Sequence, residues 1–161
     1  MAFSYSGPDY RPSLLQSVLA MFRRPARLQI AALCHRMREG KVEVLLVTSK
    51  STRRWILPKG WPILSRRAHR TAAIEAFEEA GVTGRVHKNP FASFSSYKGG
   101  EAGLKLRTEI LVFLVDVESE AEEFPDSAER DVRWVSIKDA VRMTNEPGLI
   151  DVFRKLNHLY G

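Results

Sequence analysis

Cysteine is nearly absent from this chain of 161 residues, since Cys34 is the only one. One thiol cannot close an internal disulfide or build a Cys-x-x-Cys metal cage, which excludes a disulfide scaffold and a cysteine zinc site. Its apolar neighbours favour a packed, reduced thiol, and we therefore expect a cytoplasmic setting. No apolar run approaches the roughly 20 residues that span a bilayer. The short apolar segment at residues 14–22 ends in two arginines instead of a cleavage site, so neither a membrane span nor a signal peptide is expected.

A dense basic run is also missing, although 25 Lys and Arg against 19 Asp and Glu give a net charge of +6. That charge is compatible with a polyanionic ligand. A basic surface that only keeps the protein soluble explains it equally well. Because aromatic and basic residues do not interleave, nucleic acid is not expected as a partner. The sequence leaves the oligomeric state open.

The chain divides into an N-terminal arm at residues 1–27 and one folded domain at residues 28–161. Three prolines surround a candidate helix at residues 13–22 of the arm, whose role the sequence does not indicate. In the domain, β-favouring runs at residues 28–37 and 42–48 flank turn residues and predict a hairpin.

Two longer β-like runs follow at residues 82–97 and 104–118, joined by a glycine turn. The second is apolar at every position from 110 to 115, which predicts a strand covered on both faces. The sequence therefore indicates an α/β fold with a sheet between helices. The other elements expected are short strands at 53–57 and 132–135, an acidic loop at 118–129, and helices at 137–143 and 147–159.

Helical spacing appears at residues 66–80, with Ser65 as the expected N-cap and Gly81 as the stop. The apolar stripe expected to face the sheet comprises Ala73, Ala76, Phe77 and Ala80.

Three glutamates, Glu75, Glu78 and Glu79, cluster on the face of this helix opposite that stripe. Like charges at this spacing destabilise a helix by roughly 0.2–0.5 kcal/mol per pair. Alone, such a cluster is typical of a solvated helix face. Alternatively, the charge of the cluster is neutralised by a divalent cation that prefers oxygen ligands, such as Mg²⁺ bound to a phosphate.

The residues around the cluster favour the second interpretation. Gly60, the three glutamates and Gly81 have the spacing of the Nudix box, which is Gly, five residues, Glu, seven residues, and then Arg-Glu-x-x-Glu-Glu-x-Gly. The chain thus resembles the Nudix hydrolases. Over residues 28–142, including Arg54-Trp55-Ile56-Leu57-Pro58, it is most similar to their diphosphoinositol polyphosphate phosphohydrolase and dinucleoside polyphosphate hydrolase branch.

The resemblance implies a Nudix α/β/α sandwich with a mixed β-sheet. It also implies a pyrophosphohydrolase that depends on Mg²⁺, with Mn²⁺ as an alternative. Glu78 and Glu79 would be metal ligands, Glu75 a further ligand or the general base, and the Gly60 carbonyl a backbone ligand. The substrate would be an inositol pyrophosphate or a dinucleoside polyphosphate.

Basic residues beside the matched segments are candidates for phosphate contacts, although each could instead be ordinary surface charge. They are Arg54, Lys59, Arg107 and Arg130. The acidic loop could add a metal ligand, and the sequence does not choose among Glu122, Glu123, Asp126 and Glu129.

Two positions depart from the box, since Arg66 replaces its first glutamate and Ile74 its arginine. In the family that arginine orients the catalytic glutamate, and we expect Arg70, one turn earlier, to reach the same region. These departures support an alternative function, a Nudix-fold nucleotide-binding or regulatory module with little turnover.

Overall fold

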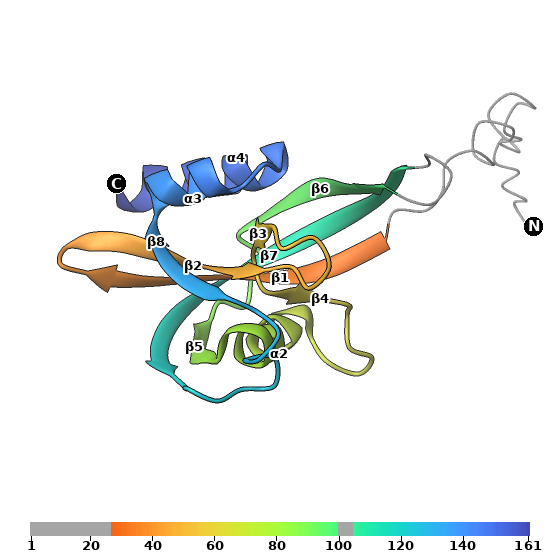
Figure 1. Ribbon diagram of the computed structural model, residues 1–161, viewed down its shortest axis with the longest axis horizontal. Helices are drawn as coiled ribbons and strands as arrows, with labels where there is room; N and C mark the ends of the chain where they lie inside the picture. The colour runs from red at the N-terminus through yellow and green to blue at the C-terminus, as the bar shows by residue number, and fades with distance from the viewer. Residues whose placement is uncertain (1–26, 100–104) are drawn as a thin grey trace, which may run out of the picture.

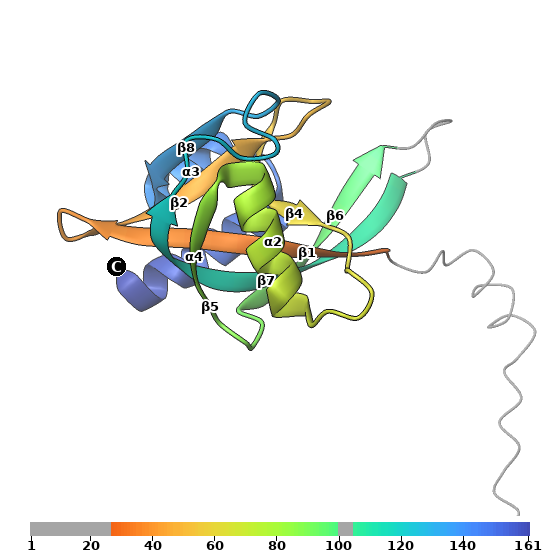
Figure 2. The ribbon, with the colours of Figure 1, turned by 90° about the horizontal axis from the view of Figure 1, so that it is seen from below.

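The computed structural model describes residues 27–99 and 105–161, where a mixed sheet lies between two helical layers. Helix α2 (Ala68–Ala80) covers one face, and α3 (Ile137–Met143) and α4 (Pro147–Tyr160) cover the other (Figures 1 and 2). This is the α/β/α sandwich that the sequence predicts. Most of the N-terminal arm, with its candidate helix at residues 13–22, lies outside the described residues.

The sheet is built around two long neighbouring strands, β1 (Arg27–Arg38) and β7 (Lys105–Glu120), which run parallel. The predicted hairpin is present, because β2 (Lys41–Thr48) pairs antiparallel with β1. On the outer side, β8 (Val132–Ser136) pairs with β2. Where β1 and β2 diverge, β3 (Trp55–Ile56) pairs with β2 and β4 (Lys59–Gly60) pairs with β1. Both parallel and antiparallel pairs occur, so the sheet is mixed.

Strand β7 is apolar at every position of its centre because helices cover both of its faces. Ile110, Val112 and Leu114 pack toward α3 and α4. Phe113 and Val115 pack toward α2. Side chains alternate along a strand, so only a strand between two cores can carry such a run. The prediction of a doubly covered strand is confirmed.

The run at residues 82–97 is two strands instead of one. Strand β5 (Val82–Val86) pairs with the C-terminal part of β7, and β6 (Ala92–Gly99) pairs with its N-terminal part. Between them the chain leaves the ladder near Pro90, a residue without an N–H to donate. The long strand predicted there was wrong for this reason.

Helix α2 begins later and faces the sheet differently than the sequence predicts. Its N-cap is Arg67, and Ser65 lies before the helix with a φ of 69°, so capping by Ser65 was wrong. The stop at Gly81 is confirmed by its αL conformation and its N–H bond to the Phe77 carbonyl. The buried stripe consists of Ala72, Ala76 and Ala80, and Phe77 is 38% exposed. Alanines four residues apart let the helix approach the sheet closely, which a phenylalanine on that face would prevent.

Helices α3 and α4 match the predicted bounds to within one residue. Among the described residues, none of the helices has the length and apolar character needed to cross a bilayer.

Candidate active site

Strand β4 brings Gly60 against Glu75 of α2. A Cβ built on Gly60 would lie 2.0 Å from Glu75 Oε1, so only glycine leaves room for that carboxylate. The register of β4 on β1, with Gly60 opposite Ile30, fixes this approach. The spacing of the predicted box therefore corresponds to a real contact between its glycine and its first helical glutamate.

The three glutamates have different surroundings. Glu79 is buried, Glu75 half-buried and Glu78 exposed. The expectation that all three share an open face opposite the apolar stripe was wrong for Glu79, which is held on both oxygens. The Lys59 backbone N–H donates to Oε2 at 3.2 Å, and Arg130 Nη2 donates to Oε1 at 2.8 Å.

Burial and crowding raise the pKa of both inner carboxyls. The pKa of Glu75 rises to about 7, chiefly because burial disfavours its charged form, with further contributions from the charges of Glu79, Glu78 and Asp126. Burial also raises the pKa of Glu79, although Arg130 and the Lys59 amide oppose that shift. A proton on Glu75 or an additional cation beside it would each relieve this burial of negative charge.

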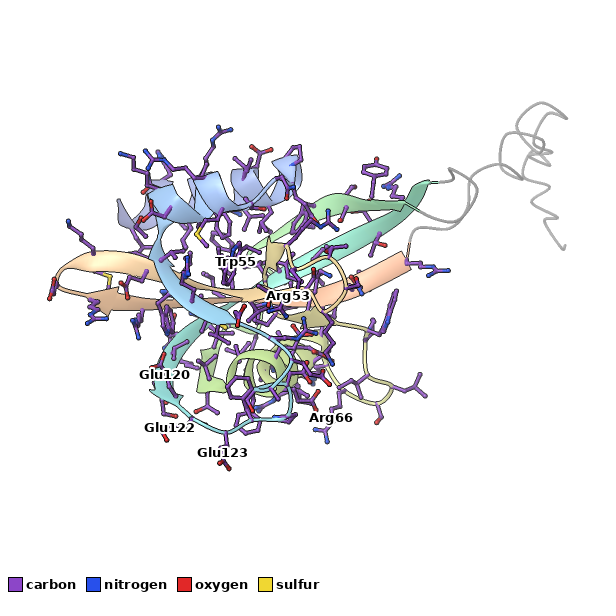
Figure 3. The ribbon with its side chains drawn as sticks, viewed as in Figure 1. Arg53, Trp55, Arg66, Glu120, Glu122 and Glu123 are labelled. Atoms are coloured by element: carbon purple, nitrogen blue, oxygen red, sulfur yellow. The ribbon has the colours of Figure 1, made fainter. Side chains whose placement is uncertain are left out.

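Of the four acidic loop candidates, Asp126 faces the cluster. Its backbone N–H donates to the Glu78 carbonyl at 2.9 Å, which ties the loop to α2. Its carboxylate accepts from Arg130 Nε at 2.8 Å. Lys50 pairs with Asp126 at 3.4 Å and with Glu129 at 2.5 Å. Glu122 and Glu123 lie on the outer side of the loop (Figure 3).

The donor chemistry of the site fits a hard divalent cation, because its donors are carboxylates and a neighbouring backbone carbonyl. The side-chain positions do not yet form a cage: within residues 27–99 and 105–161, no three His, Cys, Asp or Glu side chains meet closely enough to hold an ion.

Two of the four basic candidates, Arg54 and Lys59, line one cavity of about 260 Å³. Its other lining residues are Ser49, Ser51, Thr52, Ile56, Tyr97 and Glu146. Arg107 lies opposite Tyr97 in the register of β6 and β7 and pairs with Glu109 at 2.5 Å. Arg130 does not line this cavity. It lines a second one of about 760 Å³ beside the acidic loop, and its guanidinium is bonded to protein acceptors.

Sequence reasoning missed Tyr97 and Glu146. No local pattern could have shown them, because the cavity joins them to Lys59 from segments 38 and 87 positions further along the chain. Arg70 is exposed, and in the described part of the chain it makes no ion pair with the three glutamates, so its expected compensating contact is not present. Arg66 also points outward, as Figure 3 shows.

The sequence pattern of the family described as "NUDIX domain" matches residues 27–156. The chain belongs to the Nudix family. Among curated relatives, "Nudix hydrolase 13, mitochondrial" of Arabidopsis thaliana is 29% identical over 110 residues, which are 65% of this chain and 54% of the relative. The chain thus spans about half the length of the curated relatives it matches.

Solved structures share the Nudix fold at lower identity. An Ap4A hydrolase from C. elegans superimposes with a TM-score of 0.61 at 17% identity, covering 84% of this chain and 99% of that one. The NUDIX domain of Shewanella oneidensis NrtR, in complex with ADP ribose, gives 0.60 at 17% identity, covering 87% and 96%.

Gly60→Ala in this Nudix domain should displace the Glu75 carboxylate while leaving the backbone in place, because the clash involves the end of a flexible side chain. We expect the hydrolytic rate to fall by roughly 10- to 100-fold with a small change in the urea midpoint. In a double-mutant cycle, Gly60→Ala should lower the rate little further once Glu75→Ala has removed the displaced carboxylate. Additive losses would show that the contact between the two residues is unimportant.

Proposed function

We propose that this Nudix domain is a Mg²⁺-dependent pyrophosphohydrolase that cleaves a phosphoanhydride bond in a highly phosphorylated small molecule. The substrate would be an inositol pyrophosphate or a dinucleoside polyphosphate, and Mn²⁺ is an alternative cofactor. The observation that carries the proposal is the crowded carboxylate cluster of α2, packed on Gly60 and next to a cavity lined by Arg54 and Lys59.

The division of roles follows from these positions. Arg54 and Lys59 would bind phosphate oxygens, Arg54 through paired hydrogen bonds and Lys59 as a point charge. Arg107, opposite Tyr97, would bind phosphate beyond the cavity. Glu78, Glu79 and the Gly60 carbonyl would hold Mg²⁺, and Glu75 would be a further ligand or the general base. Bound Mg²⁺ polarises phosphate and lowers the pKa of water.

The relatives support this proposal without fixing the substrate. A dinucleoside polyphosphate is the substrate in the name of one structural neighbour, and ADP ribose is bound to another. Tyr97 and Glu146 in the cavity favour a ligand with an aromatic, hydrogen-bonding part over a purely anionic one. A cytoplasmic location remains part of the proposal, whereas the curated relatives are named as mitochondrial or chloroplastic.

A product-release assay tests the proposal. Dinucleoside polyphosphates, nucleoside di- and triphosphates and inositol pyrophosphates are compared with Mg²⁺, with EDTA, and with Mg²⁺ restored. We expect release from at least one class with Mg²⁺, loss in EDTA and recovery afterwards. An isolated carboxylate cluster without an ion cannot activate water in this way.

No release from any substrate would favour the alternative, a nucleotide-binding or regulatory Nudix module. Arg66 and Ile74, which replace two charged residues of the box, are the specific observation behind that alternative. In that case the same nucleotides should still bind, as measured by calorimetry, without being cleaved.

A further inference from the structure

Arg130 lies directly behind Glu79, and both side chains are buried, at 10% and 8% exposure. The guanidinium donates to three different acceptors. They are Glu79 Oε1 at 2.8 Å, Asp126 Oδ2 at 2.8 Å and the Thr48 carbonyl at 2.9 Å. A planar guanidinium with three fixed acceptors has little freedom to rotate.

These acceptors belong to the central sheet, to the acidic loop and to α2 itself. Thr48 ends β2, within the central sheet. Asp126 is tied to α2 through the bond from its N–H to the Glu78 carbonyl. The guanidinium is thus anchored on two sides of the helix and presents its remaining nitrogen, Nη2, to Glu79.

Glu79 is consequently held at both ends of its carboxylate, by Arg130 on Oε1 and by the Lys59 amide on Oε2. Each oxygen keeps a lone pair for another partner. Within the described residues no second guanidinium is bonded to Glu79, and position 74 holds an isoleucine. The sequence predicts a substrate contact for Arg130, whereas in the structure all three nitrogens of its guanidinium donate to protein acceptors.

We propose that Arg130 is a positioning residue that fixes the Glu79 carboxylate in the orientation required for cation binding and hydrolysis. The inference rests on the proposed function, and a substrate-free ion-binding measurement separates the two. Residues that orient metal ligands in this way typically contribute about 10- to 100-fold to metal affinity or activity.

The test compares Arg130→Met and Arg130→Lys with a matched control, Arg53→Met. Arg53 bonds to the same loop, at the Glu129 carbonyl and at Asp131, both at 2.7 Å, without contacting Glu79. The readouts are kcat and KM with the substrate found active, and Mn²⁺ affinity of the substrate-free protein by calorimetry.

We expect Arg130→Met to lower kcat and Mn²⁺ affinity by roughly 10- to 100-fold with little change in KM. Arg130→Lys should recover part of the loss, because it keeps the charge but cannot reach three acceptors. Arg53→Met should match the wild type in both readouts. If Arg130→Met does not fold, Arg130→Lys carries the test, with circular dichroism confirming its fold.

Three results with the variants would overturn the inference, and so would one with the wild type. A raised KM with unchanged kcat would make Arg130 a substrate contact. Wild-type kcat and ion affinity, with only a lower melting temperature, would make it a structural brace. If Arg53→Met loses as much kcat and Mn²⁺ affinity as Arg130→Met, the losses come from weaker anchoring of the acidic loop. If the wild type binds Mn²⁺ but cleaves no substrate, only the proposed function fails, and the Mn²⁺ affinities of the variants still test the role of Arg130. If the wild type neither binds Mn²⁺ nor cleaves a substrate, the proposed function and the role of Arg130 both fail.

Discussion

Glu79→Gln is expected to lower kcat by about 10²- to 10⁴-fold while the protein remains folded. The exchange preserves the shape of the side chain and an acceptor for the Lys59 amide, which lies 3.2 Å from Oε2. It removes the negative charge that an ion needs as a ligand. Arg130 still pairs with Asp126, so the buried guanidinium keeps one carboxylate partner. Steady-state kinetics in saturating Mg²⁺ measure the loss of kcat, and circular dichroism on the same sample shows whether the protein remains folded.

Glu123→Gln is the matched control, since Glu123 is an exposed glutamate on the outer side of the acidic loop (Figure 3). It removes the same charge from the chain, so any effect of net charge on substrate attraction appears in both variants. We expect wild-type kcat for the control. A fully active Glu79→Gln protein would defeat the catalytic role of the cluster, and an equally inactive control would show that general electrostatics dominate.

The sequence predicts the layers of the fold well because local patterns record burial directly. Strand β7 is apolar on both faces since helices lie on both sides, and this is readable from residues 110–115 alone. Helix α2 is harder. Alanine and phenylalanine are both apolar, so period alone cannot show that the close approach to the sheet selects Ala72 and Ala76 and leaves Phe77 outside.

The site is less accessible to sequence reasoning, because its electrostatics depend on contacts between distant segments. Gly60 and the three glutamates share one motif, and their proximity is predictable. Arg130 is 51 positions from Glu79, and nothing in its neighbourhood distinguishes a buried partner from a surface charge. The same is true of Asp126, one acidic residue among several in a loop whose course only the fold determines.

Phe153→Ala should destabilise the protein by about 3–5 kcal/mol, the usual cost of removing a buried aromatic side chain and leaving a cavity. Phe153 is 0% exposed on α4, in the core between that helix and the sheet. Phe77→Ala removes the same atoms from α2, where the residue is 38% exposed, and should cost about 1–2 kcal/mol. Urea unfolding of both variants, at constant m-value, gives the two free energies.

This pair of phenylalanines also tests how α2 sits on the sheet. The apolar spacing of the sequence places Phe77 on the covered face beside Ala76 and Ala80, whereas the structure leaves Phe77 outside and buries Ala72 there. If Phe77→Ala costs as much as Phe153→Ala, the helix is rotated toward the face that the spacing predicts. That rotation would also carry Glu79 away from Arg130 and the Lys59 amide, because all three α2 glutamates turn with the helix. A small loss for Phe77→Ala therefore supports the buried position of Glu79 through a measurement that involves neither substrate nor metal.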